Sequence, residues 1–171
     1  MHTRVLQCHA GTLLVRPLRR GDVRTVLAVF ERLGEESRRR RFNGAKPCLR
    51  PHELRRLAAV DARHHALVAY LENDPRPVAI ARLVRTGRSA EIAFEVADEH
   101  QQRGIGAALT AELVADARAA GVTELTALVA SDNRPALALL GRTLGKLTTR
   151  LEGADRWVSA SIATGAAGGR T

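Results

Sequence analysis

The stretch AEIAFEVADEHQQRGIGAALTAELVADARAA, residues 90–120, decides the fold of this chain. Its first eight residues, 90–97, alternate small or branched apolar residues with Glu91 and Glu95, which predicts a β-strand. Its second half repeats leucines four residues apart, the spacing of one face of an α-helix. A polar loop that contains two glycines joins the two halves. The sequence therefore predicts a strand, a loop and a helix in direct succession.

The loop QQRGIG, residues 101–106, is suited to hold an anion. It falls at the start of the predicted helix, where backbone N–H groups lack partners and the helix dipole is positive. Gly104 and Gly106 allow a ligand to approach the backbone closely. The motif lacks the third glycine of a dinucleotide-binding loop and the Gly-Lys-Ser/Thr of a P-loop. The sequence thus predicts a pyrophosphate site but does not by itself identify the ligand.

The rest of the chain predicts a mixed α/β sheet with helices on both faces. Strands are expected over residues 12–16, 65–71, 78–84, 125–130, 147–151 and 156–162, and helices over 23–33, 35–42, 47–60, 106–120 and 134–144. The turn residues at 73–75 indicate an antiparallel hairpin. The strand, helix, strand order across 90–130 indicates one parallel pair.

The chain is long enough for one well-buried domain and short for two. Residues 1–10 show no clear period and are expected to form a flexible arm. The single domain is expected over 11–163, and the tail 164–171, which has nothing to bury, is expected to be disordered. No apolar run approaches 18 residues, so we expect neither a signal peptide nor a membrane span.

The formal net charge of +9 favours an anionic partner, such as coenzyme A phosphates, nucleic acid or an acidic protein face. Only 3% of residues are aromatic, which argues against a surface that stacks nucleic-acid bases. The basic run Arg38–Arg41 fits either a solvated helix face or a contact with an acidic substrate. Composition therefore restricts the partner without choosing it.

Two cysteines, Cys8 and Cys48, have no metal-ligand spacing and fit a reduced, cytoplasmic setting without a metal. No histidine is positioned to activate Cys48 in the sequence, so a covalent cysteine mechanism is not expected. His64 and His65 are adjacent on a predicted strand and must face opposite sides, which excludes a joint role. The chemistry must lie elsewhere.

Five segments follow one another in the order VRPLRRGD (15–22), FERLGEESRRRRFNGA (30–45), ALVAY (66–70), AEIAFEVADEHQQRGIGAAL (90–109) and SDNRPALAL (131–139). Together they resemble the GNAT acyltransferase superfamily and, within it, the acetyltransferase domain of bacterial Pat-type protein lysine acetyltransferases. The resemblance covers roughly residues 15–145. It implies a GNAT fold that binds acetyl-CoA in a V-shaped split between parallel strands and passes acetyl directly to an amine.

The resemblance also implies site residues. It places the general base at Glu91, with Glu95 as second choice, and puts cofactor contacts on Val96, Ala97, Asp98, Gln101, Gln102, Arg103, Gly104, Ile105, Gly106 and Asn133. The reacting amine must lose a proton, and a carboxylate among apolar neighbours is a better base because it is partly desolvated. On the residues alone, both glutamates could be solvent-facing positions, and Asn133 could simply cap the following helix.

Two positions depart from the family pattern. Gln102 stands where relatives often have glycine, and Leu140 stands where many have a tyrosine that protonates the leaving thiolate. The favoured acceptor is the lysine side chain of a protein. A small-molecule amine acceptor and a non-catalytic binding module with a basic face remain alternatives. We expect no metal, nucleic acid or membrane partner, no room for a fused regulatory domain, and a monomer or a homodimer.

Overall fold

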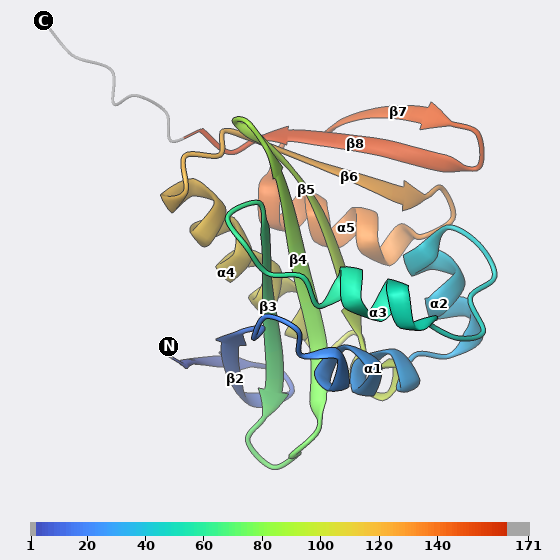
Figure 1. Cartoon of the computed structure of the whole chain (residues 1–171). Helices are drawn as coiled ribbons and strands as arrows, with labels where there is room; N and C mark the ends of the chain where they lie inside the picture. The colour runs from blue at the N-terminus through green and yellow to red at the C-terminus, as the bar shows by residue number, and fades with distance from the viewer. Residues whose placement is uncertain (1–2, 164–171) are drawn as a thin grey trace, which may run out of the picture.

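The computed structural model describes residues 3–163, and an eight-stranded sheet with helices on both faces accounts for most of them (Figure 1). In chain order the elements are β1 (Arg4–Cys8), β2 (Gly11–Pro17), α1 (Val23–Glu31), α2 (Glu35–Phe42), α3 (Pro51–Leu57), β3 (His64–Leu71), β4 (Pro77–Thr86), β5 (Ser89–Val96), the 3₁₀ turn η1 (Asp98–His100), α4 (Ile105–Ala119), β6 (Glu124–Ala130), α5 (Arg134–Leu144), β7 (Thr148–Glu152) and β8 (Asp155–Ser161). The strand order is β1-β2-β3-β4-β5-β6-β8-β7. The mixed α/β sheet predicted from sequence is confirmed.

Two clusters of buried side chains hold the helices against the sheet. On one face Leu109 of α4 and Leu140 of α5 pack with Ile92 of β5. On the other face Phe30 of α1 packs with Ile80 of β4. Most of these side chains are aliphatic, as the low aromatic content requires. Figure 1 shows α4 and α5 behind the sheet and α1, α2 and α3 in front of it.

Strands β5 and β6 form the one parallel pair and make a fork. They pair only over Ser89–Glu91 and Glu124–Thr126, and beyond these residues no pairing connects them. All other neighbouring strands run antiparallel. Because parallel strands end at the same edge of a sheet, the starts of α4 and α5 both follow the open end of this fork.

The expected flexible arm at residues 1–10 is wrong for residues 4–8, which form β1. Every residue of β1 pairs with β2. Arg4 also donates to Glu112 at 2.9 Å and to Asp116 at 2.6 Å on α4. Strand alternation is present, with Arg4 and Leu6 facing inward, but the inward arginine hides it from a hydrophobicity pattern. Residues 1–2 and the predicted tail 164–171 lie outside the described residues.

The other boundaries follow local chemistry. Asp22 caps α1 by accepting from the Thr25 N–H at 3.1 Å. Helix α3 is shorter than the predicted 47–60, because the Glu53 carboxylate accepts from the Arg50 N–H at 2.8 Å and fixes the start there. Among the described residues, no helix is both long and apolar enough to cross a membrane.

Candidate active site at the fork of β5 and β6

The loop after β5 presents a row of free backbone donors. Between residues 3 and 163, no hydrogen-bond acceptor is found for the backbone N–H groups of residues 102–107. The first bond of α4 is donated by Ala108 to the Gly104 carbonyl at 3.0 Å. Six consecutive donors at a helix N-terminus form a cradle for an anion such as a pyrophosphate.

The backbone of this cradle has an unusual conformation. Gly104 lies at φ +82° and Gln102 at φ +59°, both in the left-handed region. Glycine adopts that region without strain, whereas Gln102 does so at a cost, which explains why a glycine would suit its position. Gly106 is needed for packing, since a Cβ there would lie 2.9 Å from Leu139 Cδ1 of α5. The close approach seats α4 against α5.

The predicted cofactor residues Asp98 and Gln101 use their side chains inside the loop. The Asp98 carboxylate accepts from the Gly34 N–H and from Gln101 Nε2, each at 3.0 Å. Gln101 Nε2 also donates to the Val96 carbonyl at 3.1 Å. Ala97 is fully buried. These side chains therefore shape the loop, while Gln102 and Arg103 are exposed.

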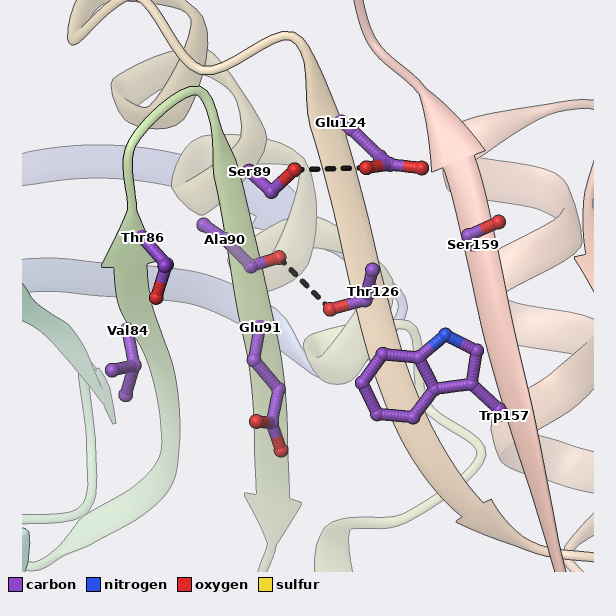
Figure 2. A pocket seen from close by; sticks show the side chains of 9 residues that line it. All are labelled: Val84, Thr86, Ser89, Ala90, Glu91, Glu124, Thr126, Trp157 and Ser159. Atoms are coloured by element: carbon purple, nitrogen blue, oxygen red, sulfur yellow. Dashed lines mark hydrogen bonds between the residues drawn. The ribbon is translucent and has the colours of Figure 1, made fainter. Parts of the chain in front are cut away.

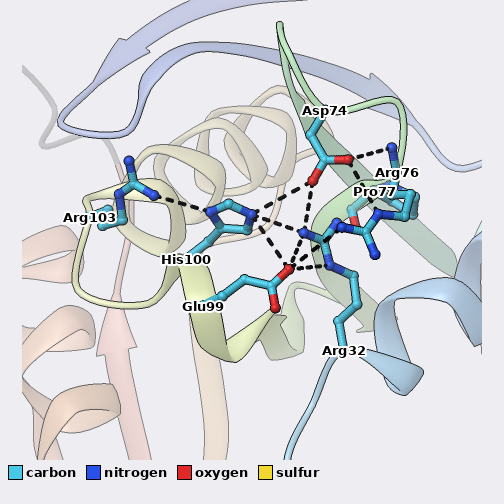
Figure 3. Close-up of polar contacts among 7 residues, drawn as sticks. All are labelled: Arg32, Asp74, Arg76, Pro77, Glu99, His100 and Arg103. Carbon is cyan, nitrogen blue, oxygen red and sulfur yellow. Dashed lines mark hydrogen bonds and ion pairs between the residues drawn. The ribbon is translucent and has the colours of Figure 1, made fainter.

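An ionic cluster contacts η1, the turn that precedes the loop (Figure 3). The Arg32 side chain, only 7% exposed, donates to Asp74 at 2.8 Å and through Nε to Glu99 at 2.9 Å. The hydrogen bond from Arg32 lowers the pKa of Glu99. The Asp98 N–H donates to the Arg32 carbonyl at 3.1 Å. The C-terminal end of α1 thus holds η1, and with it the cradle, in place.

Asn133 lies at the start of α5, across the open end of the fork from β5. Its Oδ1 accepts from the Ala136 N–H at 3.2 Å, so Asn133 caps the helix. Capping was one of the two roles that the sequence allowed for this residue. Its side-chain NH₂ has no partner among residues 3–163 and can still donate to a ligand. Capping and ligand binding are therefore compatible.

Glu91 stands where the two strands separate. It faces Thr126 in the last pair of the β5 and β6 ladder. Its side chain is exposed and forms no hydrogen bond or ion pair with the described residues. The partial burial expected from its apolar neighbours is wrong, because Ala90 and Ile92 point to the opposite face of the strand. Glu91 is free to accept a proton from a molecule at the fork.

Glu95 lies on the same strand face but in a closed ionic cluster. Its side chain, 6% exposed, pairs with Arg41 of α2 and with Arg82 Nη2 at 3.4 Å. Burial opposes its ionisation, but the two guanidinium groups outweigh burial and lower its pKa. A carboxylate held ionised by two arginines is a poor proton acceptor. The structure therefore argues against the second choice of base.

The basic run of α2 is partly exposed, but its arginines form ion pairs and a stacking contact within the protein. Arg41 pairs with Glu95, and Arg39 donates to Asp132 at 2.6 Å. The Arg38 guanidinium stacks over the Phe30 ring, 4.3 Å from its centroid. Helix α2 contacts both β5 and β6, so these ion pairs fasten it across the fork. No local pattern in the sequence indicates these distant partners.

An open pocket of about 430 Å³ borders Glu91 on the sheet face beside α3 (Figure 2). Its other lining residues come from four neighbouring strands or the turn between them: Val84, Thr86, Ser89, Ala90, Glu124, Thr126, Trp157 and Ser159. Sequence reasoning missed Glu124 and Trp157. Within each strand, the alternation of apolar and polar residues indicates which side chains share a face of the sheet. It does not show which strands lie side by side, so it could not bring Glu124 and Trp157 together with Glu91.

The remaining candidates lie away from this site. His64 contacts Asp61 at 2.9 Å, and His65 contacts Asp116 of α4 at 2.8 Å, so the two histidines occupy opposite faces as predicted. Cys48 is an exposed free thiol. Within residues 3–163, no group of three or more His, Cys, Asp or Glu side chains is arranged to hold a metal ion.

Comparisons with known proteins place the fold and the site in one family. The chain matches the acetyltransferase (GNAT) family over residues 30–145. It is 35% identical over 140 residues to acetyltransferase Pat of Mycolicibacterium smegmatis. The aligned residues make up 80% of this chain and 41% of Pat. The chain thus spans less than half of the length of that relative.

Solved structures agree with this fold. The GNAT domain of S. lividans PAT superposes with a TM-score of 0.84 at 24% identity, over 94% of this chain and 97% of that domain. A cAMP-binding acyltransferase from Mycobacterium smegmatis superposes with a TM-score of 0.67 at 26% sequence identity. This match covers 95% of this chain and 48% of that one. A PaiA N-acetyltransferase from Thermoplasma acidophilum, in complex with coenzyme A, superposes with a TM-score of 0.66 at 14% sequence identity. This match covers 87% of this chain and 98% of that one.

The family match covers more than half of the 171 residues and includes the fork, the cradle and Glu91. The chain therefore belongs to the acetyltransferase (GNAT) family.

Proposed function

We propose that this protein transfers acetyl from acetyl-CoA to a primary amine, with the lysine side chain of a protein as the favoured acceptor. The observation that carries the proposal is the pairing of two features on one strand: a cradle of six free N–H groups at its end and an unpartnered glutamate at the fork. The likeness to acetyltransferase Pat supports a protein lysine as acceptor.

The cradle fits the pyrophosphate of coenzyme A. Its N–H groups can each donate to a phosphate oxygen. Gly104 and Gly106 let the loop pack closely on the rest of the protein, because a Cβ at either position would contact neighbouring protein atoms. Glu91 and Val96 are five residues apart on an extended strand, or about 16 Å. This spacing suits a long cofactor whose charged end and reactive end lie apart. The free NH₂ of Asn133, at the start of α5, can bind the arm between them.

Acetyl-CoA supplies an acetyl group activated as a thioester. The chain supplies a base, since an alkylammonium has a pKa above 10 and reacts only after it loses a proton. Glu91 takes that proton from the amine nitrogen. The nitrogen then bonds to the acetyl carbon as the carbon–sulfur bond breaks, and it loses its second proton to solvent. The leaving sulfur finds no tyrosine at Leu140, which is fully buried in the core, so solvent is the proton source that remains.

Calorimetry with acetyl-CoA and a thiol-release assay test the proposal together. We expect saturable acetyl-CoA binding and release of free thiol with lysine peptides. Glu91→Gln should keep the affinity for acetyl-CoA and lower the rate by roughly 10²- to 10⁴-fold. Absence of binding at millimolar acetyl-CoA would remove the proposal.

The same assay decides between acceptor classes. Lysine peptides, amino sugars and aliphatic polyamines can be compared at equal concentration. Turnover of amino sugars with no turnover of peptides would replace the protein acceptor by a small molecule. A non-catalytic binding module would show no thiol release with any amine. The basic run of α2 lends that alternative no support, because its arginines are used in internal contacts.

A further inference from the structure

The pocket beside Glu91 is acidic in a strongly basic chain. The sequence holds 27 Lys and Arg against 18 Asp and Glu. None of the nine residues that line the pocket is basic, and two of them, Glu91 and Glu124, are acidic (Figure 2). A pocket with this lining attracts cations, although the molecule as a whole repels them.

Glu124 is held in a fixed orientation. Ser89 Oγ donates to one of its carboxylate oxygens at 2.8 Å. No Lys or Arg forms an ion pair with Glu124 among residues 3–163. One carboxylate oxygen therefore remains available to a cation that enters the pocket. Glu124 shares this availability with Glu91 but has an anchored side chain.

The two carboxylates are too far apart to serve one nitrogen. Glu91 lies opposite Thr126, and Glu124 precedes Thr126 by two residues on the adjacent strand. With a rise of about 3.3 Å per residue and strands about 4.8 Å apart, their Cα atoms lie about 8 Å apart. Figure 2 shows the two carboxylates at opposite ends of the pocket. Each can bind a separate cationic group.

Trp157 forms the wall of the pocket beside Glu91, at the end away from Glu124 (Figure 2). Its half-buried indole reaches the pocket from β8. Within the described part of the chain, no arginine or lysine stacks on this ring, although four such contacts occur on Tyr70, Phe30 and Phe42. An indole face packs well against an alkyl chain and attracts a cation.

From these features we infer that the acceptor is a dication. Its reacting primary ammonium lies at Glu91, beside the indole of Trp157, and a second cationic group of the same molecule pairs with Glu124. This inference rests on the proposed function and specifies its acceptor. A protein lysine next to a basic residue and an aliphatic diamine share this chemistry.

Binding can be measured directly, because Trp157 is the only tryptophan of the chain. The intact protein is titrated with 1,5-diaminopentane and with 1-aminopentane, followed by Trp157 emission and by calorimetry. We expect the diamine to bind more tightly by up to about 5-fold, the size of one added ion pair near a surface. Glu124→Gln, which can still accept from Ser89, should remove this advantage.

A matched control separates local from general charge. Glu72 is exposed on the β3–β4 hairpin, away from the pocket, and Glu72→Gln removes the same charge. This variant should keep the preference for the diamine. Equal affinity for both amines in the unmodified protein, or a preference that survives Glu124→Gln, would overturn the inference.

Turnover separates this inference from the proposed function and identifies the source of the dication. Thiol release is compared for lysine peptides flanked by arginine or by alanine and for the two amines. A higher kcat/KM for the arginine-flanked peptide indicates a protein acceptor, and a higher value for the diamine indicates a small molecule. Equal turnover of all four compounds refutes the dication while acetyl transfer stands. Tight diamine binding without thiol release refutes acetyl transfer while the dication site stands.

Discussion

The substitutions Glu91→Gln and Glu95→Gln should have opposite consequences, although the two glutamates lie four residues apart on one strand face. Glu95 is 6% exposed and holds Arg41 and Arg82, which are 15% and 10% exposed. Removing its charge leaves two buried guanidinium groups without a counter-ion. Breaking a buried ion pair in this way costs about 3 to 5 kcal/mol.

That cost is a large part of the stability of an ordinary domain, which is about 5 to 15 kcal/mol. For a domain of this size, each kcal/mol shifts the midpoint of thermal unfolding by about 2 to 4 °C, so Glu95→Gln should lower it by roughly 6 to 20 °C. Glu91 is exposed and has no partner to lose, so Glu91→Gln should change stability by at most about 0.5 kcal/mol.

Urea denaturation measures both variants, and the thiol-release assay measures their rates at a temperature where both are folded. Arg41→Gln, alone and combined with Glu95→Gln, completes a double-mutant cycle that should show strong coupling between the two sites. The lowered pKa of Glu95 adds a pH test. Its stabilising effect is present above the ordinary glutamate pKa of about 4.3 and is lost as the pH falls, so Glu95→Gln should flatten that loss.

A loss of less than about 1 kcal/mol in Glu95→Gln would show that the cluster is solvated and that the burial argument is wrong. Full activity in Glu91→Gln, with Glu95→Gln inactive but folded, would exchange the roles assigned to the two residues. Equal loss of rate in both variants would mean that they share the proton transfer.

Three further perturbations test other parts of the site. Gly104→Asp adds a negative charge to the cradle and should weaken acetyl-CoA binding by at least about 10-fold in calorimetry. Gly104→Asn has the same left-handed strain at φ +82° but no charge, and it should weaken binding much less. Equal weakening in the two variants would show that shape alone, and not charge, causes the loss. The Asp74 carboxyl has a pKa of about 2, because bonds from the Arg76 N–H and Arg32 outweigh burial. Stability should therefore fall as the pH drops from about 4 towards 2, and Asp74→Asn should reduce this fall in acid denaturation curves; an unchanged curve would contradict it. Arg39→Ala breaks exposed ion pairs with Glu36 and Asp132 and should lower the free energy of unfolding, measured with urea, by less than about 1 kcal/mol; a larger loss would show that these pairs are the main contacts that hold α2 in place.

Local patterns in the sequence were enough to predict the elements that carry the cradle. The strand at 89–96 alternates, the loop is marked by Gly104, and the helices begin at capping residues such as Asn133. Each signal depends on residues within a few positions of one another. The same is true of the parallel pair, which follows from a helix placed between two strands.

The roles of the two glutamates could not be separated in this way. Both lie on the same face of β5, and neighbouring residues are similar. What separates them is the position of Arg82, 13 residues away, and of Arg41, 54 residues away. Only the packing of α2 against the sheet brings Arg41 to Glu95 and leaves Glu91 open. A base can be recognised from sequence by a family pattern, but its freedom from partners is a tertiary property.

Net charge was a poor guide for the same reason. A value of +9 predicts attraction of anions by the whole molecule, and the cradle fits that expectation. The arginines of α2, however, are neutralised by Glu95 and Asp132, whereas the pocket beside Glu91 contains no basic residue. At the ionic strength of a cell, charges beyond about 8 Å are largely screened, so a ligand at the fork responds to Glu91 and Glu124 more than to the distant surface. The two ends of one site can therefore attract opposite charges: phosphates at the end of β5 and an ammonium at the point where β5 and β6 separate.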